Sequence, residues 1–309
     1  MKLQHIIEQH WYNKVNPYLA LLLFPFSIIY AIIIIIRRWL FILKLKTQTK
    51  IAVPVVIIGN ISVGGAGKTP LTKALATDLI AKGIKVGIIL RGYKGSADKE
   101  LIVKTTDSSA IVGDEALIYA QAGFRVAIGR KRVAAAQLLL SEYPETQLIL
   151  ADDGMQHYYL DRDMEICVID SSRMFGNQQL LPLGPLRESM NRLKSVDAIV
   201  INGYANQDKL TSILAKYPVP IYYQELEFVH FYNPQTQQIA TIQEMKNQRL
   251  MAIAAIGNPA RFFNYLKDLG LKLSEQRAFP DHYHYLKSDI SSQYAIITTE
   301  KDYTKLAQF

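Results

Sequence analysis

Short apolar runs rich in valine and isoleucine recur between residues 53 and 201, and each has the length of a strand. We predict strands in this region at residues 55–58, 86–90, 101–104, 125–128, 147–151, 165–170 and 197–201. Helices are predicted at about 71–81, at 114–122, and from the basic cluster after Gly129 to Glu142. Strands that alternate with helices indicate an α/β fold with a mostly parallel, doubly wound sheet.

An uncharged run of nineteen residues, 18–36, precedes this region, and Arg37 and Arg38 close it. Its length suits a transmembrane helix, and the larger number of basic residues after the run would leave the rest of the chain in the cytoplasm. Pro25 and Ser27 interrupt the run, so a helix in the membrane interface is the close alternative. A buried helix of a soluble protein is the third. We predict a membrane anchor and leave its depth open.

The pattern changes near residue 217. Extended segments at 218–232 and 238–242 flank a turn-forming Asn-Pro-Gln-Thr sequence, which predicts a β-hairpin. Strands at 250–256, 272–279 and 295–298 and a helix at 259–269 then predict a smaller α/β unit. We therefore divide the chain into a membrane-associated segment (1–46), a main domain (47–217), a β-ribbon linker (218–245) and a C-terminal α/β domain (246–309).

The charge distribution favours contact between the basic N-terminal segment and an anionic surface outside the protein. Residues 1–50 carry seven of the 35 basic residues and one of the 27 acidic residues, so most of the net charge of +8 lies there. The remainder is nearly balanced, which argues against a nucleic-acid partner, and no feature indicates a protein partner. The single cysteine, Cys167, cannot form an internal disulfide and is expected to fill a small space in the core.

The stretch 55–75 carries the clearest chemistry. A β-branched strand leads into a glycine-rich loop and then into a helix that begins at Lys68-Thr69. This order is typical of the phosphate-binding loop (P-loop) of nucleotide triphosphatases, although Ser62 stands where glycine is usual. Loop amides and the helix N-terminus would surround phosphate oxygens. The expected contacts are Ser62, Val63, Gly64, Gly65, Ala66, Gly67, Lys68 and Thr69.

Two positions predict a Mg²⁺ site beside this loop. The Thr69 hydroxyl is expected to hold the ion, while Lys68 reaches the β- and γ-phosphates of the nucleotide. The apolar run 147–151 ends in Asp152-Asp153-Gly154. An acid at the end of such a strand, downstream of a P-loop, is the expected second ligand, directly or through water. Asp152 is therefore predicted to be a ligand of Mg²⁺, directly or through water.

Three further charged positions allow both a functional and a structural interpretation. Arg91 follows a predicted strand at the edge where open α/β sheets bind ligands, so it is either an anion contact or a solvated loop residue. Arg130 opens a basic cluster at a helix start, where positive charge opposes the helix dipole unless an anionic ligand is bound. Asp114 lies in a first helical turn, where acids are common for electrostatic reasons alone.

As an ordered set, the motifs resemble those of the tetraacyldisaccharide 4′-kinase family, the lipid A 4′-kinases. Of the single motifs only the P-loop is specific, and it indicates nucleotide binding. The ordered set of motifs is very specific for this family and spans most of the chain. Ser62 also agrees with the loop of this family. The matching segments are 59–70, 91–93, 113–115, 152–157, 181–188, 279–282 and 298–302.

The resemblance implies an ATP- and Mg²⁺-dependent kinase that phosphorylates the 4′-hydroxyl of a tetraacyldisaccharide 1-phosphate, which gives the lipid IVA intermediate of lipid A. It implies a place on the cytoplasmic face of the bacterial inner membrane and two α/β domains joined by a β-ribbon. Asp114 would assist the attacking hydroxyl, with His282 beside it. The residues implied for the metal and the electrostatics of the site are Asp152 and Asp153, and those implied near the nucleotide are Arg187 and Glu188.

Two departures from the family pattern affect these assignments. Met155 stands where the family more often has Phe or Leu, which is a neutral packing exchange. The segment after Asp281-His282 reads Tyr283-His284 where the family favours a second adjacent histidine, so His282 and His284 compete for one role. Family members commonly continue beyond the equivalent of the last residue, so a closing element is expected to be missing.

A rival with the same P-loop is a membrane-tethered NTPase switch that acts on a partner protein. A guanine-reading Asn-Lys-x-Asp segment would favour it, but the sequence has none, and segment 298–302 has the wrong spacing. A non-catalytic membrane scaffold is a second rival, but it would not need Lys68, Thr69 and Asp152 together. The lipid kinase is therefore the leading prediction.

Overall fold

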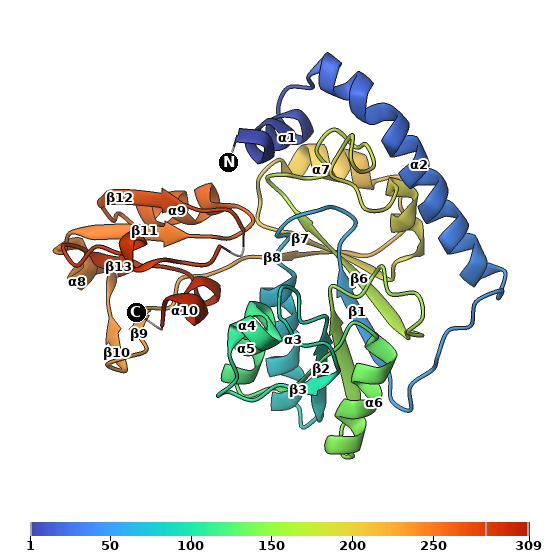
Figure 1. Ribbon diagram of the computed structural model, residues 1–309, viewed down its shortest axis with the longest axis horizontal. Coiled ribbons are helices and arrows are strands. Elements are labelled where there is room, and N and C mark those ends of the chain that lie inside the picture. Colours follow the sequence, from blue (N-terminus) through green and yellow to red (C-terminus); the bar gives the residue numbers. More distant parts are fainter. Residues whose placement is uncertain (1, 282, 308) are drawn as a thin grey trace.

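The computed structural model describes residues 2–281, 283–307 and 309, which form two α/β domains, a short ribbon and an N-terminal helical segment (Figure 1). The main domain is built on an eight-stranded sheet in the order β3-β4-β2-β5-β1-β6-β7-β8. All neighbouring strands are parallel except β3 and β4. The strands are β1 (Val55–Gly59), β2 (Val86–Leu90), β3 (Leu101–Ile102), β4 (Arg125–Ile128), β5 (Leu148–Asp152), β6 (Met164–Asp170), β7 (Ala198–Asn202) and β8 (Ile221–Gln224).

Helices cover both faces of this sheet, as the predicted doubly wound fold requires. Neighbouring residues of one strand face opposite sides, so Ile57 and Ile58 of β1 belong to different buried clusters. The Ile57 cluster includes residues of α6 (Arg132–Glu142), η1 (Met190–Ser195) and α7 (Gln207–Leu214). The Ile58 cluster includes residues of α3 (Lys68–Ala81), α4 (Ser109–Val112) and α5 (Asp114–Gln121). Both clusters are apolar, which explains the near-continuous hydrophobic runs of the strands.

The C-terminal domain is a smaller parallel sheet in the order β12-β11-β13. Its central strand is completely buried, and helices and loops pack on both of its faces. The elements are α8 (Ile242–Lys246), β11 (Leu250–Ala254), α9 (Pro259–Asp268), β12 (Leu273–Ala278), η2 (Lys287–Asp289), β13 (Ala295–Ile297) and α10 (Glu300–Leu306).

The predicted ribbon at 218–245 needs a correction. Its first part forms β8, which pairs in parallel with β7 and extends the main sheet, so the antiparallel ribbon comprises only β9 (Phe231–Asn233) and β10 (Gln238–Ala240). A parallel neighbour needs a crossover, and helix α7, which the sequence pattern did not identify, provides it. The main domain therefore extends beyond residue 217.

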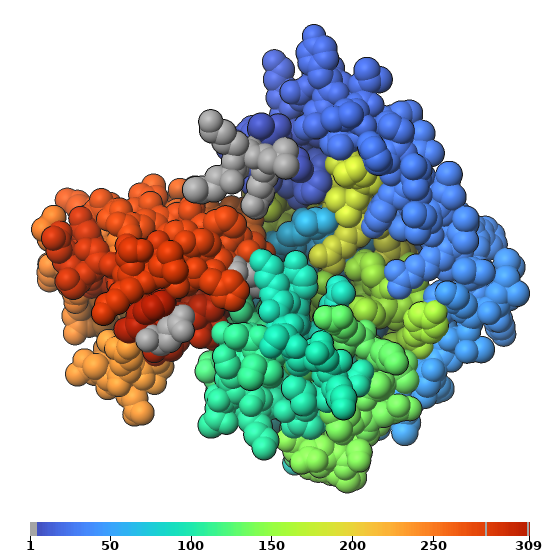
Figure 2. Space-filling view, in the orientation of Figure 1, coloured from blue at the N-terminus to red at the C-terminus, as the bar shows by residue number. Residues whose placement is uncertain are grey.

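The N-terminal segment consists of α1 (Lys2–Tyr12) and α2 (Pro17–Ile42), joined by a turn in which the Asn16 side chain caps α2. Helix α2 is longer than the uncharged run, and among the described residues it is the one helix long and apolar enough to cross a membrane. Only 6% of an 18-residue stretch of α2 is buried, which excludes the buried-helix alternative. Figure 2 shows the segment in blue, spread over one side of the main domain.

One face of α2 is bound to the main domain along most of its length. Ser27 Oγ donates a hydrogen bond to the Leu180 carbonyl at 3.0 Å, and Tyr30 OH donates to the Arg187 carbonyl at 2.9 Å. Farther along, Arg37 Nη2 donates to the Gln156 carbonyl at 2.8 Å. Helix α2 is therefore hydrogen-bonded directly to the segments that carry several predicted site residues.

Candidate active site

The glycine loop lies where the sequence predicts it, between the end of β1 and the start of α3. Gly67 caps α3 with φ = 92°, and Gly64 has φ = 109°, so both adopt a backbone conformation that favours glycine. A Cβ on Gly67 would also lie 2.1 Å from Asn202 Nδ2. The loop therefore requires glycine at both positions to keep its shape.

Lys68, Asp153 and Arg187 form a charged group at the mouth of the loop. Lys68 Nζ lies 3.4 Å from Asp153 Oδ1, and Arg187 Nη1 lies 3.0 Å from both carboxylate oxygens of Asp153. Burial alone would raise the pKa of Asp153, but Lys68 and Arg187 outweigh it and hold that pKa well below its usual range. Two cations and one fixed anion leave positive charge for a phosphate group.

Asp152 occupies a different environment one residue earlier. Its side chain is buried, and it accepts hydrogen bonds from Tyr119 OH at 2.7 Å and from the Asp153 amide at 2.9 Å. Burial and the nearby Glu115 carboxylate raise the pKa of Asp152 to about 7, against the opposing effect of Lys68. A cation at this position would favour the ionised form.

The residues beside the loop fit Mg²⁺. The Thr69 hydroxyl and the carboxylates of Asp152 and Asp153 are hard oxygen donors, which Mg²⁺ prefers. The described residues contain no cluster of three or more His, Cys, Asp or Glu side chains that could enclose a metal. An ion at this place would therefore take further oxygens from a nucleotide phosphate or water, which is the usual arrangement for Mg²⁺.

The proline-rich loop 181–188 is tied to the P-loop. The Arg187 amide donates to the Ile61 carbonyl at 2.7 Å, and the Val63 amide donates to the Pro185 carbonyl at 2.8 Å. This brings the Arg187 guanidinium to Asp153. The Glu188 side chain is buried instead, where it accepts a hydrogen bond from Gln156 Nε2 at 2.8 Å and another from Tyr158 OH.

Asp114 opens helix α5 and faces the C-terminal domain. Its Oδ2 atom lies 3.2 Å from Lys305 Nζ of α10, and both side chains are buried. Nearby, Lys301 Nζ lies 3.0 Å from Asp281 and 4.0 Å from Glu115. The start of α5 and the segment that ends at Asp281 therefore meet at the domain boundary.

The histidine predicted to pair with Asp114 lies outside the described residues, because His282 is not among them. His284, the competing histidine, has an exposed side chain. The neighbouring Tyr283 ring stacks on Phe279, with 4.5 Å between ring centroids. The choice between the two histidines stays a prediction.

The two basic residues proposed as anion contacts, Arg91 and Arg130, are both exposed. The buried member of the basic cluster is Arg132, which donates to the Gly129 carbonyl at 2.7 Å. Burial lowers the pKa of Arg132 to about 10, while Asp153 and Asp152 oppose that shift. Sequence reasoning identified the cluster but not Arg132, whose signal was its position at a helix start.

His157 belongs to the matching segment 152–157, but the sequence pattern indicated no role for it. Burial, together with the charges of Arg132 and Arg91, lowers the pKa of His157 to about 3. The imidazole is therefore neutral at physiological pH. It therefore adds no positive charge to the group around Asp153.

The C-terminal domain contacts the phosphate loop and its support. Backbone atoms of Gly257 approach Gly65 so closely that a Cβ on Gly257 would lie 2.6 Å from the Gly65 amide nitrogen. Arg261 of α9 lies 3.3 Å from Asp170 at the end of β6 and 3.4 Å from Asn202 at the end of β7. The C-terminal domain therefore packs directly against the P-loop and against the ends of β6 and β7.

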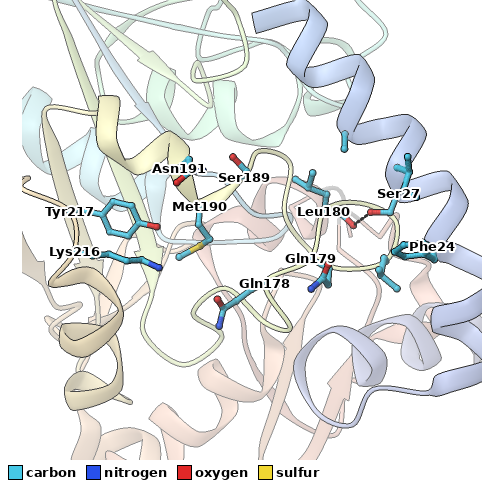
Figure 3. Close-up of a pocket in the computed structure, with 13 residues that line it drawn as sticks. Phe24, Ser27, Gln178, Gln179, Leu180, Ser189, Met190, Asn191, Lys216 and Tyr217 are labelled. Carbon is cyan, nitrogen blue, oxygen red and sulfur yellow. Dashed lines mark hydrogen bonds between the residues drawn. The ribbon is translucent and has the colours of Figure 1, made fainter.

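A separate cavity of about 430 Å³ lies between α2 and the loop before η1 (Figure 3). Ser27 and Phe24 project from α2 on one side, and Lys216 and Tyr217 lie on the opposite side. The P-loop does not line it. The lining residues are Phe24, Ser27, Ile28, Ala31, Gln178, Gln179, Leu180, Leu183, Ser189, Met190, Asn191, Lys216 and Tyr217.

Comparisons with known proteins agree with this geometry. The family described as tetraacyldisaccharide-1-P 4′-kinase matches residues 19–309. The tetraacyldisaccharide 4′-kinase of Chromobacterium violaceum is 43% identical over 304 residues, which cover 98% of this chain and 88% of that protein. The corresponding protein of Methylobacillus flagellatus is 41% identical over 306 residues, with 98% and 88% covered.

Among solved structures, LpxK from Aquifex aeolicus in complex with ATP matches with a TM-score of 0.78 and 31% sequence identity. The match covers 93% of this chain and 90% of the Aquifex chain. The sequence, the fold and the arrangement of the glycine loop agree with one another. The chain therefore belongs to the tetraacyldisaccharide-1-P 4′-kinase family.

Proposed function

We propose that this protein transfers the γ-phosphate of ATP to the 4′-hydroxyl of a tetraacyldisaccharide 1-phosphate, which gives lipid IVA in lipid A biosynthesis. The observation that carries the proposal is the group formed by Lys68, Asp153 and Arg187 at the mouth of a glycine loop. Phosphoryl transfer depends on positioning and on neutralising phosphate charge, and this group provides both.

The charged residues divide the work as follows. Lys68 and Arg187 contact the transferring phosphate, while Asp153 holds both cations in place. Thr69 and Asp152 would hold Mg²⁺, which would supply positive charge against the phosphate oxygens when bound. Asp152 needs to be ionised for this role, and the adjacent Lys68 favours that form.

Asp114 receives the proton of the attacking hydroxyl in this proposal, with His282 as its partner. A sugar hydroxyl is a weak acid, so a positioned base is worth roughly 10²–10⁴-fold in rate. Lys305 lies 3.2 Å from Asp114 and compensates the buried carboxylate. Lys305 belongs to the C-terminal domain, so this compensating contact forms only when the two domains are together.

Membrane association through α2 suits an acylated acceptor. We propose that α2 lies in the membrane interface, because its inner face is hydrogen-bonded to the main domain from Ser27 to Arg38. A helix that crossed the hydrocarbon in this arrangement would carry polar loop backbone with it, where no water can satisfy it. The basic residues after the run would contact anionic headgroups on the cytoplasmic face of the bacterial inner membrane.

The decisive experiment is incubation of the purified protein with γ-labelled ATP, Mg²⁺ and a tetraacyldisaccharide 1-phosphate in mixed micelles. Label in the disaccharide lipid at the 4′-position is the expected result. Label that appears only as free phosphate, at the same rate with and without the lipid, would overturn the kinase and favour an NTPase switch. An acceptor that lacks the 4′-hydroxyl is the matched control.

A further inference from the structure

Side chains brace the outside of the P-loop at three carbonyl groups. Tyr12 OH donates a hydrogen bond to the Val63 carbonyl at 3.1 Å. Asn202 Nδ2 donates to the Ala66 carbonyl at 3.1 Å, and Gln224 Nε2 donates to the Gly67 carbonyl at 3.0 Å. Asn202 and Gln224 come from adjacent strands of the main sheet, whereas Tyr12 comes from α1 in the N-terminal segment.

These hydrogen bonds also fix where the loop amides point. In a planar trans peptide the carbonyl and the following N–H point in opposite directions. Holding the carbonyl of Val63 toward α1 therefore turns the Gly64 amide away from α1, and the same relation holds for the other two braced carbonyls. Amides turned away from the outside of the loop are what a phosphate cradle requires.

Tyr12 is held firmly in this position. Trp11 Nε1 donates to the Pro182 carbonyl at 3.0 Å, and the His10 ring lies 3.1 Å from the Leu183 carbonyl. The Arg173 guanidinium lies over the Tyr12 ring, 4.9 Å from its centroid, and next to Gly64. Helix α1 is therefore docked on the P-loop and on the loop that carries Arg187.

We propose that Tyr12 is a positioning residue of the nucleotide site, through which the N-terminal segment holds the P-loop in its phosphate-binding shape. The inference rests on the proposed role of the P-loop in binding ATP. It gives the N-terminal segment a task beyond membrane attachment: the ATP site is complete only when α1 is docked.

The test uses the full chain in detergent and compares Tyr12→Phe with Tyr18→Phe. Both substitutions remove one hydroxyl from the same segment, but residue Tyr18 is 85% exposed. Tyr12→Phe is expected to weaken binding of a non-hydrolysable ATP analogue roughly five- to tenfold, the worth of one hydrogen bond. The KM for ATP should rise in parallel, while the KM for the lipid, the Tm and membrane sedimentation stay unchanged. Tyr18→Phe should change none of these.

Lys68→Ala separates failure of this inference from failure of the proposed function. Loss of analogue binding in Lys68→Ala, with unchanged binding in Tyr12→Phe, would overturn the role of Tyr12 and leave the P-loop assignment standing. A lower Tm in Tyr12→Phe without weaker binding would do the same, since the hydroxyl would then serve stability alone. Unchanged binding in Lys68→Ala would overturn the P-loop assignment itself.

Discussion

Gly65 and Gly257 meet backbone to backbone across the boundary between the two domains. A Cβ added to Gly257 would lie 2.6 Å from the Gly65 amide nitrogen, closer than real Cβ contacts allow. The neighbouring atom belongs to the phosphate loop and cannot rotate aside as a side chain does. Because glycine has only a hydrogen atom in place of a side chain, position 257 lets the C-terminal domain approach the P-loop this closely.

We expect Gly257→Ala to separate the domains without unfolding either, because each has its own buried core. A displacement of about 1 Å at a reacting centre lowers kcat on the order of 10²-fold. Steady-state kinetics and thermal unfolding measure the two effects. Gly83→Ala is the control for backbone strain alone, since nothing lies within 4 Å of a Cβ there but φ is +86°, so it should lower the Tm and leave kcat unchanged. A normal kcat in Gly257→Ala would show that the contact is dispensable.

Lys68→Ala should lower kcat by roughly 10²-fold or more, because it removes one of the two cations that pair with Asp153 beside the proposed phosphate position. The fold should persist, as circular dichroism can verify. Lys82→Ala is the matched control, since Lys82 lies at the end of the same helix in an exposed pair with Asp78. Equal activity of the two variants at saturating ATP would remove Lys68 from the mechanism.

Asp114→Ala and His282→Ala should each reduce kcat strongly with little effect on ATP affinity. If the two residues handle one proton, the double variant loses much less than the product of the single losses. His284→Ala is the control for the choice of histidine. Multiplicative losses would break the proposed pair, and a larger loss at His284 than at His282 would transfer the role to His284.

The pKa of about 7 at Asp152 predicts how stability depends on pH. Between about pH 4, its usual range, and pH 7 the folded protein holds a proton that the unfolded chain has released, so the free energy of unfolding falls as pH rises. Above pH 7 this contribution levels off. Without nucleotide and Mg²⁺, Asp152→Asn should therefore raise the Tm at pH 8 and have a smaller effect at pH 5. A pH-independent difference in Tm would contradict the shift.

Deletion of residues 1–46 should release the protein from membranes and lower its activity on lipid in vesicles. The exposed apolar face of α2 and the basic residues after it are the reason. Sedimentation with vesicles of anionic phospholipid measures binding. Undiminished sedimentation of the truncated protein would place the membrane contact on another surface.

The strands of the main sheet were predictable because each is an apolar run with clear ends, and β2 and β4 agree with the prediction at both ends. The placement of β8 was not, because four residues of mixed burial look the same in a ribbon and at a sheet edge. Local spacing was enough to predict the position of the glycine loop between β1 and α3 and of Asp152 at the end of β5, while the roles of these residues stay predictions.

The supporting residues were not predictable in the same way. The contacts come from Tyr12, Lys305 and Gly257, which lie far away in the sequence, and none of these belongs to a local pattern that indicates a ligand. Lys305 in particular reads as an ordinary cation in the last turn of a helix. Such residues become visible only when the fold brings the segments together.

The attachment of α2 along its length has a consequence for substrate choice. An anchor joined by a flexible linker would let the catalytic domain sample many heights above the bilayer, whereas α2 is hydrogen-bonded to the loops that carry Arg187 and Gln156. The proposed placement of α2 in the interface would hold the P-loop at one height over the membrane surface. A hydroxyl would then have to reach that height to be phosphorylated, so depth in the bilayer would discriminate between the hydroxyls of one sugar before any side chain contacts them.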